Sequence, residues 1–284
     1  MKKKQDLAGL ALYYILAYAI GGFAGMLVSG MIFKVFVFDV VATLVIFLFS
    51  VIMKNSSVYD PYWSLTPMLI SLWIFFTEKS FGIWQIVFLV IWNLWSIRLT
   101  VHWLRIFSDF SYEDWRYRKF RDENPPFVWF WLNLFGIHLV PTLVVFLGML
   151  PMLAVSGNSL GALSLPGMAI MLFGICAELI ADVQMREYLQ QAKGEKTVCR
   201  KGLWGYSRHP NYLGEISVWT GAYFAMLPYV PEKWYYAVGF LSIAVLFLTV
   251  SVPMMEKRQM SRRADYAAYR KEISMLLLLP KRRK

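Results

Sequence analysis

Eight apolar segments, most of them close to 20 residues long, dominate this 284-residue chain. About 20 apolar residues in a helix are enough to cross a lipid bilayer. Helices are the expected form, because backbone polar groups find no water inside a bilayer. The segments cover residues 7–28, 35–53, 63–77, 82–104, 127–153, 163–185, 211–228 and 234–255. The sequence therefore predicts an all-α, polytopic transmembrane bundle of about seven to eight spans, built as a single membrane domain, 1–284.

The basic residues are distributed unevenly between the loops. Of the 29 Lys and Arg residues, all but four lie in the N-terminus, at Lys54 and in segments 105–126, 186–210 and 256–284. The four exceptions are Lys34, Lys79 and Lys233 in the alternate loops and Arg98 within a span. Because basic loops remain on the cytoplasmic side of a membrane, this bias predicts that both termini are cytoplasmic. The net charge of +11 then reflects topology, and we expect contact with membrane lipids and not with nucleic acid.

A dense polar and aromatic segment, Gly202–Glu215, leads into the seventh span. Proline is favoured in the first turn of a helix, so a helix is predicted to begin near Pro210. The positive end of that helix, with Arg208 and His209 just before it, would favour a phosphate group. Asn211 and Glu215 are four residues apart and share a helix face, where they could hydrogen-bond an amide or a ribose. The alternative is that Arg208, His209 and Tyr206 only anchor the helix at the membrane interface.

Three further groups of polar residues border or enter the spans. Glu178, Asp182 and Arg186 form one helical stripe at the end of span six, although Asp182 and Arg186 could simply pair with each other. Arg258, at the end of span eight, is either a basic flank or a binding residue. Arg98 and His102 are four residues apart within span four, and charged groups inside a span usually face the bundle interior. They therefore belong either to a site or to a structural ion pair.

A second polar and aromatic cluster, Tyr59–Ser64, begins span three. Tyr and Trp are common at membrane interfaces, so Asp60 is its informative member. Asp60, Tyr59 or Tyr62 could donate or relay a proton. The sequence contains no Gly-x-Gly-x-x-Gly motif, no P-loop and no Cys–His metal set, so no metal site is predicted and any nucleotide must be bound by the helices themselves.

Taken together, these motifs resemble those of the steroid 5α-reductase-like membrane proteins, and most closely their bacterial branch of unknown function. The long motif from Gly202 to Glu215 carries most of the resemblance. Supporting matches over about residues 55–280 are Asp60-x-x-Trp63-Ser64, Arg98-Leu99, Glu113-Asp114-Trp115-Arg116-Tyr117, Ala181-Asp182-x-Gln184, and Glu256-Lys257-Arg258 followed by Tyr266 and Tyr269. Isoprenylcysteine carboxyl methyltransferases, which bind S-adenosylmethionine, share the Arg-His-Pro-x-Tyr core. The resemblance therefore indicates the superfamily more specifically than the reaction.

The resemblance implies a bundle of about seven helices that binds NADPH on its cytoplasmic side through the C-terminal half, 176–273. Cofactor contacts are implied for Glu178, Asp182, Arg186, Asn211 and Glu215, with Tyr206, Arg208, His209, Arg116 and Arg258 as further candidates. Glu178 departs from the steroid enzymes, which have Asn there. The counterparts of their substrate-binding residues are Asp60 and His102, but the Tyr that follows the His in those enzymes is absent here.

The expected function is reduction of a conjugated carbon–carbon double bond in a steroid-like or other lipid, with NADPH as the hydride donor. Catalytic roles are expected for Asp60, Tyr59, Tyr62 and His102. The alternatives are an isoprenyl or lipid methyltransferase that uses S-adenosylmethionine and, third, a non-enzymatic membrane protein. We expect a monomer in the bacterial inner membrane.

Overall fold

Helices form nearly all the regular structure of the chain. The computed structural model describes residues 2–79, 82–154, 160–192, 194 and 196–281. Among these residues there is no β-strand, and one isolated bridge joins Ser207 to Ser274. The predicted all-α class is therefore confirmed. Packing divides the chain into two compact units, Met1–Asn158 (the first unit) and Ser159–Lys284 (the second unit).

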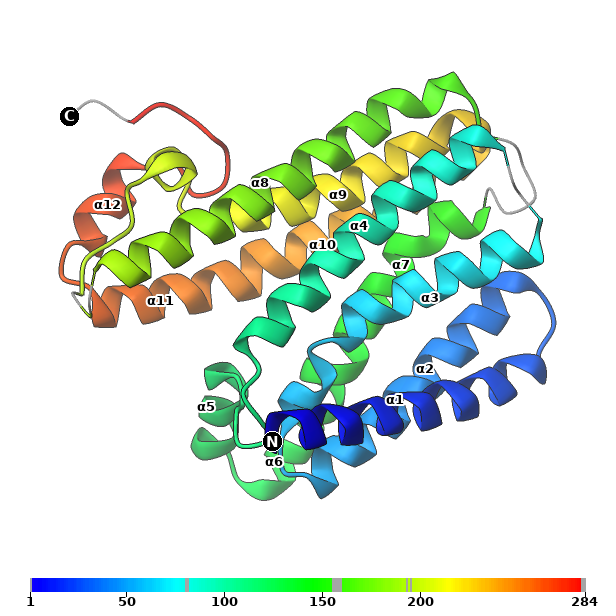
Figure 1. Ribbon diagram of the computed structural model, residues 1–284, viewed down its shortest axis with the longest axis horizontal. Coiled ribbons are helices and arrows are strands. Elements are labelled where there is room, and N and C mark those ends of the chain that lie inside the picture. Colours follow the sequence, from blue (N-terminus) through cyan, green and yellow to red (C-terminus); the bar gives the residue numbers. More distant parts are fainter. Residues whose placement is uncertain (1, 80–81, 155–159, 193, 195, 282–284) are drawn as a thin grey trace. The chain divides into compact units, whose positions relative to one another are not determined.

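The first unit begins with a hairpin of two long helices, α1 and α2 (Figure 1). Gly30 precedes α2 with a φ of 82°, a conformation that favours glycine. A Cβ atom at Gly21 would lie 2.7 Å from the carbonyl oxygen of Phe38, so the two backbones approach closely at this glycine. The helices of this unit are α1 (Lys2–Met26), α2 (Met31–Ile52), η1 (Ser56–Tyr59), α3 (Tyr62–Thr77), α4 (Ile83–Ile106), α5 (Trp115–Glu123), α6 (Pro126–Trp131), η2 (Leu132–Leu139) and α7 (Val140–Ala154).

The second unit is built around α8 and α9, which lie side by side (Figure 1). They run antiparallel, because Gly167 of α8 meets Gly221 of α9 while Gly174 meets Gly214. As predicted, α9 begins at Pro210. The helices of this unit are η3 (Ala162–Ser164), α8 (Leu165–Gln191), η4 (Gly202–Gly205), α9 (Pro210–Met226), η5 (Leu227–Tyr229), η6 (Pro231–Ala237), α10 (Val238–Leu246), η7 (Phe247–Ser251), α11 (Val252–Arg262) and α12 (Tyr266–Glu272).

Six helical segments among the described residues are long and apolar enough to cross a membrane. They are Lys3–Met26, Met31–Ile52, Ile83–Ile106, Pro126–Ala154, Ala162–Gln191 and Pro231–Arg262. The other two predicted spans correspond to α3 and α9, which have 16 and 17 residues. The chain is therefore a multi-pass membrane protein, while the number of spans and the cytoplasmic location of the termini stay predictions.

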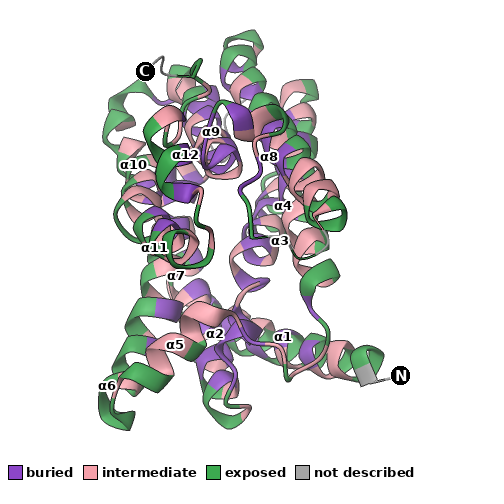
Figure 2. Cartoon of the chain, turned by 90° about the vertical axis from the view of Figure 1, so that its left-hand side faces the viewer, coloured by how far each residue is buried: buried purple, intermediate pink, exposed green. Residues whose placement is uncertain are grey.

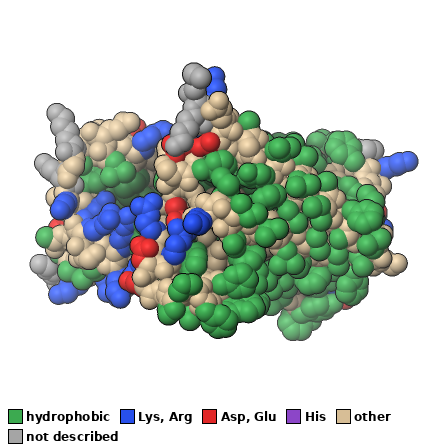
Figure 3. Space-filling view, turned by 90° about the horizontal axis from the view of Figure 1, so that it is seen from below, with side chains coloured by type: hydrophobic (Ala, Val, Ile, Leu, Met, Phe, Trp, Pro, Cys, Tyr) green, Lys and Arg blue, Asp and Glu red, His purple; other side chains and the backbone are tan. Residues whose placement is uncertain are grey.

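The surface and the interior agree with a membrane environment. Large apolar side chains such as Leu12, Phe23 and Val245 are more than half exposed, as expected of positions that face lipid. Hydrophobic side chains cover much of the face drawn in Figure 3, and charged side chains gather in a separate area of it. Buried positions recur at intervals along helices such as α2 and α9, and they mark the faces that pack inside each unit (Figure 2).

The structure changes one prediction about the C-terminal region. The pattern of residues 256–273 predicts a single amphipathic helix, but the helix ends at Arg262 and a new one starts at Tyr266. Asp265 lies at the break, and its carboxylate accepts a hydrogen bond from the backbone N–H of Val198 at 3.0 Å. This distant contact, together with the burial of Tyr266 and Tyr269 against Val198 and Ile273, favours two short helices over one long one.

Candidate functional site

The segment Gly202–Glu215 is docked on the end of α8. Gly202 has a φ of 56°, and a Cβ atom there would collide with the side chain of Gln184. That side chain accepts a hydrogen bond from the backbone N–H of Leu203 at 2.9 Å, and the indole N–H of Trp204 donates to the carbonyl of Ala181 at 3.0 Å. Glycine is therefore required where the segment turns onto α8.

Arg208 is buried and binds groups of the protein itself. Its Nε donates a hydrogen bond to Glu256 at 2.7 Å. Its Nη1 donates to the backbone carbonyls of Arg270 and Ile273 at 2.9 and 2.6 Å. Its side chain is 8% exposed and that of Glu256 is 7% exposed. In this arrangement Arg208 fixes the start of α9 to α11 and α12, and its predicted contact with a phosphate stays a prediction.

His209 belongs to the same buried cluster. Its Nε2 lies 3.4 Å from Glu256, and its ring stacks on Tyr212 with 5.3 Å between the ring centres. Arg270 approaches the other oxygen of Glu256 at 3.2 Å. Three basic side chains, Arg208, His209 and Arg270, thus lie within 4 Å of the Glu256 carboxylate and offset the cost of burying its charge.

The C-terminal segment closes around the motif. Tyr269 donates to the carbonyl of Trp204 at 2.7 Å, and Ser207 donates to the carbonyl of Leu276 at 2.7 Å. The backbone N–H of Arg208 binds the carbonyl of Ser274 at 2.9 Å. Burial raises the pKa of Tyr266 to about 12, so its phenol is neutral at physiological pH. These contacts make the C-terminal segment part of the site's framework.

The facing surfaces of α8 and α9 carry the other predicted cofactor residues. Glu178 and Glu215 are buried, and Glu178 packs against Gly214. Glu215 accepts a hydrogen bond from the indole N–H of Trp219 at 2.8 Å. Because the helices are antiparallel, Asp182 and Asn211 lie one turn farther toward the start of α9, and both are partly exposed. The structure therefore brings these four residues onto one helix pair, with the outer two accessible to a ligand.

The remaining cofactor candidates are more exposed or lie in the other unit. Arg186 is exposed at the end of α8, Tyr206 is 51% exposed, and Arg258 is partly exposed on α11. Arg116 belongs to the first unit, where its Nε binds Asp114 at 2.8 Å. The roles of these four residues in cofactor binding stay predictions.

In the first unit, Tyr59 and Tyr62 lie together in a buried aromatic cluster. Their rings stack with 5.3 Å between centres. The hydroxyl of Tyr59 lies 2.7 Å from that of Thr142, and the hydroxyl of Tyr62 lies 2.8 Å from a carboxylate oxygen of Asp39. Two of the predicted acid or oxyanion residues thus form one group of neighbouring phenols.

Asp39 is a residue of this cluster that the sequence reasoning missed. It is 2% exposed and is the only acidic residue in α2, whose other residues are almost all apolar. Ionisable side chains inside membrane spans are costly and are usually functional. A lone acid in the middle of a strongly apolar segment was the signal that could have identified it.

Asp60 lies at the start of α3 and accepts a hydrogen bond from Tyr117 at 2.8 Å. Burial raises the pKa of this carboxyl to about 7; Asp114 adds to the shift, and Arg116 and the Tyr117 hydroxyl oppose it. A carboxyl group with a pKa near neutrality can hold and release a proton under physiological conditions. The catalytic role of Asp60 stays a prediction.

The raised pKa gives a prediction for stability. From about pH 4 to about pH 7, the folded state holds a proton on Asp60 that the unfolded state has lost, so stability falls as the pH rises. Asn resembles the protonated carboxyl and does not titrate. We therefore expect Asp60→Asn to raise the melting temperature relative to the wild type more at pH 8 than at pH 5, measured in detergent. Asp122 is exposed, so Asp122→Asn serves as the control. If Asp60→Asn changed the melting temperature equally at both pH values, the pKa of Asp60 would not be raised by folding.

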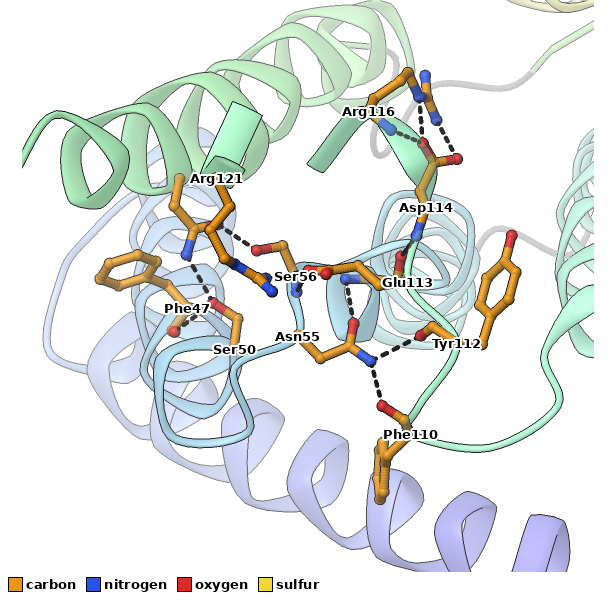
Figure 4. A network of polar contacts seen from close by, with 12 residues as sticks. Phe47, Ser50, Asn55, Ser56, Phe110, Tyr112, Glu113, Asp114, Arg116 and Arg121 are labelled. Carbon is orange, nitrogen blue, oxygen red and sulfur yellow. Dashed lines mark hydrogen bonds and ion pairs between the residues drawn. The ribbon is translucent and has the colours of Figure 1, made fainter. Parts of the chain in front are cut away.

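A polar network holds the loop that carries Tyr59 and Asp60 (Figure 4). The side-chain amide of Asn55 donates to the carbonyls of Phe110 and Tyr112, both at 2.8 Å. Glu113 accepts from the backbone N–H of Ser56 at 3.0 Å and also binds Arg121. The loop is therefore fixed by the segment that precedes and includes α5, although the sequence motifs around Glu113 gave no indication of this role.

His102, the last catalytic candidate, lies on α4 four residues after Arg98. Both side chains are partly buried. The catalytic role of His102 stays a prediction.

Comparison with known proteins identifies the family. Residues 46–273, most of the chain, match the family described as protein of unknown function (DUF1295). The chain belongs to the DUF1295 family. It is also 28% identical over 200 residues to a protein of Schizosaccharomyces pombe that bears the name Uncharacterized protein C594.04c. The match covers 61% of this chain and 58% of that protein, and no solved structure matches.

Proposed function

We propose that this DUF1295 protein is a membrane-embedded reductase that uses NADPH to reduce a conjugated carbon–carbon double bond in a lipid substrate. The observation that carries the proposal is the arrangement on α8 and α9. Two buried carboxylates, Glu178 and Glu215, lie beside a close contact of the two helices, and the accessible Asp182 and Asn211 follow one turn farther out. The resemblance to the steroid 5α-reductase-like proteins assigns cofactor contacts to these same four residues.

The chemistry of these residues fits parts of a dinucleotide. Carboxylate oxygens accept hydrogen bonds from ribose hydroxyls, and the Asn side chain can both donate to and accept from an amide. The accessible Arg186 and Tyr206, together with the positive end of α9, would favour phosphate groups. Arg208 would act indirectly by holding the start of α9 in place.

Bound NADPH would supply a hydride, which would add to the β-carbon of the conjugated system. The protein must then stabilise the negative charge that develops on the substrate's carbonyl oxygen and deliver a proton to the α-carbon. Tyr59 and Tyr62 are the residues proposed for the first of these roles, and either phenol would have to exchange its present partner, Thr142 or Asp39, for such an oxygen. Asp60, with a pKa of about 7, is the group that can release a proton near neutral pH.

A methyltransferase that uses S-adenosylmethionine remains the second candidate, and one observation favours it. Arg208 was expected to contact phosphate, yet it binds Glu256 and backbone carbonyls. S-adenosylmethionine has a ribose but no phosphates, so a site with fewer available arginines would suit it. The same carboxylates would then bind its ribose.

Ligand-induced stabilisation tests the proposal. A ligand that binds only the folded state raises its melting temperature. We expect NADPH to raise the melting temperature of the detergent-purified protein, with smaller effects of NADH and S-adenosylmethionine. A shift with S-adenosylmethionine alone would support the methyltransferase, and no shift with any of the three would contradict both enzyme proposals.

The variant Asn211→Ala tests the site itself. Loss of a hydrogen bond to the ligand should weaken NADPH binding by about tenfold, because such a bond contributes roughly 1–2 kcal/mol. Ser217→Ala is a matched control on the same helix, since the Ser217 hydroxyl binds only the carbonyl of Leu213 among the hydrogen bonds described for it. Glu215→Ala is less informative, because it also removes the partner of Trp219. Equal NADPH affinity in Asn211→Ala and the wild type would remove Asn211 from the site.

A further inference from the structure

A groove with a volume of about 370 Å³ lies between α1, α2 and α3 of the first unit. Val35 and Ile70 form its buried floor. Met26, Leu69 and Trp73 line its edge and are 80%, 38% and 43% exposed. In a chain that crosses the membrane, an apolar groove with exposed apolar edges opens toward the lipid. Its volume lies within the range of about 300–1,000 Å³ that is typical of small-molecule pockets.

Two glycines of α1 create this groove. Gly25 allows α1 to approach α2, since a Cβ atom there would lie 2.9 Å from the carbonyl oxygen of Lys34. At Gly22 a Cβ atom would meet no other atom within 4 Å, so the space beside it is open. Tyr18 closes the inner end of the groove, and its hydroxyl lies 3.1 Å from that of Thr66. The interior of the groove is thus shaped for an apolar chain.

A positive charge lies at one end of the groove. Among the described residues that line it, Lys34 is the only charged one. Lys34 lies in the first turn of α2, so the positive end of that helix is beside it. Most basic residues lie in loops that are predicted to be cytoplasmic, but Lys34 does not. The tendency of basic residues to remain in the cytoplasm therefore does not explain the position of Lys34. An apolar groove with a cationic end is complementary to a lipid with an anionic headgroup.

We propose that this groove binds an anionic membrane phospholipid. One acyl chain lies in the groove along Gly22, Val35 and Ile70, and the headgroup phosphate binds Lys34. Burial of the chain supplies most of the affinity, because each buried methylene contributes to it. Lys34 supplies the preference for an anionic headgroup. The proposal does not depend on the reductase function.

Native mass spectrometry of the delipidated full-length protein tests the proposal. The probes are phosphatidylglycerol and phosphatidylcholine with identical acyl chains. We expect the wild type to bind phosphatidylglycerol about fivefold more tightly than phosphatidylcholine. One Lys near an anionic headgroup contributes about 1 kcal/mol, which corresponds to that ratio of affinities. Lys34→Gln should remove this preference by weakening the binding of phosphatidylglycerol more than that of phosphatidylcholine.

Gly22→Leu should fill the groove and weaken the binding of both lipids by about tenfold, because the acyl chain loses its place. Ala19→Leu adds a similar side chain to an exposed position of the same helix and should bind both lipids as the wild type does. Melting temperatures confirm that the variants are folded. Unchanged lipid binding in Gly22→Leu overturns the site, and equal wild-type affinity for the two lipids overturns the role of Lys34.

Discussion

Arg208→Met is expected to destabilise the second unit by roughly 3–5 kcal/mol, the usual effect of breaking a buried ion pair by removing one partner. The variant leaves Glu256 buried with weaker compensation and removes the donors to the carbonyls of Arg270 and Ile273. Those carbonyls belong to the segment that closes around residues 202–210. Unfolding with increasing SDS in mixed micelles would measure the free energy, and limited proteolysis would show early cleavage near α12.

An exposed ion pair of the same unit provides the control. Lys201 pairs with Glu187 at 3.2 Å, and the two side chains are 55% and 46% exposed. Pairs of this kind contribute about 0–1 kcal/mol, so Lys201→Met should change the free energy of unfolding little. If Arg208→Met were as mild as Lys201→Met, the buried cluster around Glu256 would not be the framework that we describe.

Gly174→Ala is the second change with a large expected effect. The added Cβ atom would lie 2.5 Å from the carbonyl oxygen of Gly214 and 2.9 Å from the backbone nitrogen of Val218. Backbone atoms cannot rotate away, so α8 and α9 must move apart. We expect a loss of about 1–3 kcal/mol or more in the free energy of unfolding, as for other overpacked interiors. Cofactor binding should weaken with it, because Glu178 and Glu215 lie beside this contact.

Gly22→Ala is the matched control for this substitution. Its Cβ atom meets no other atom within 4 Å, and alanine favours a helix over glycine by about 1 kcal/mol. The variant should therefore be as stable as the wild type or slightly more stable. Equal stability of Gly174→Ala and Gly22→Ala would show that the two helices are not held as closely as the structure places them.

Local sequence was sufficient to predict most of the helices. Long apolar runs predict helices in a bilayer, where no other form satisfies the backbone. Pro210 located the start of α9, and α5 ends at Glu123, directly before Asn124-Pro125-Pro126. In both cases the deciding feature is the geometry of the proline ring, which acts on neighbouring residues and so can be read locally.

Contacts between distant residues could not be predicted in the same way. The break between α11 and α12 depends on Asp265 binding the N–H of Val198, 67 residues earlier. The partner of Arg208 could not be chosen either, because several acids had suitable positions in the sequence. Only the fold of the second unit brings Glu256 of α11 to Arg208.

The cofactor roles of the candidate residues stay predictions, and only their positions in the fold can be compared with the sequence. Glu178, Asp182, Asn211 and Glu215 fall on two facing helices, as their four-residue spacings suggested. Asp39 was not predicted, because its hydrogen bond with Tyr62 joins two helices, α2 and α3, whose contact cannot be read from local sequence.

The closure of the motif by the C-terminal segment has a consequence for biosynthesis. The carbonyls that hold Arg208 come from residues 62 and 65 positions later in the chain. The motif therefore cannot reach its final form while the ribosome is still translating that region. A nascent chain interrupted after α11 would contain every residue proposed to bind the cofactor, yet it would lack the segment that fixes the start of α9. The site is thus completed only after α12 has left the ribosome.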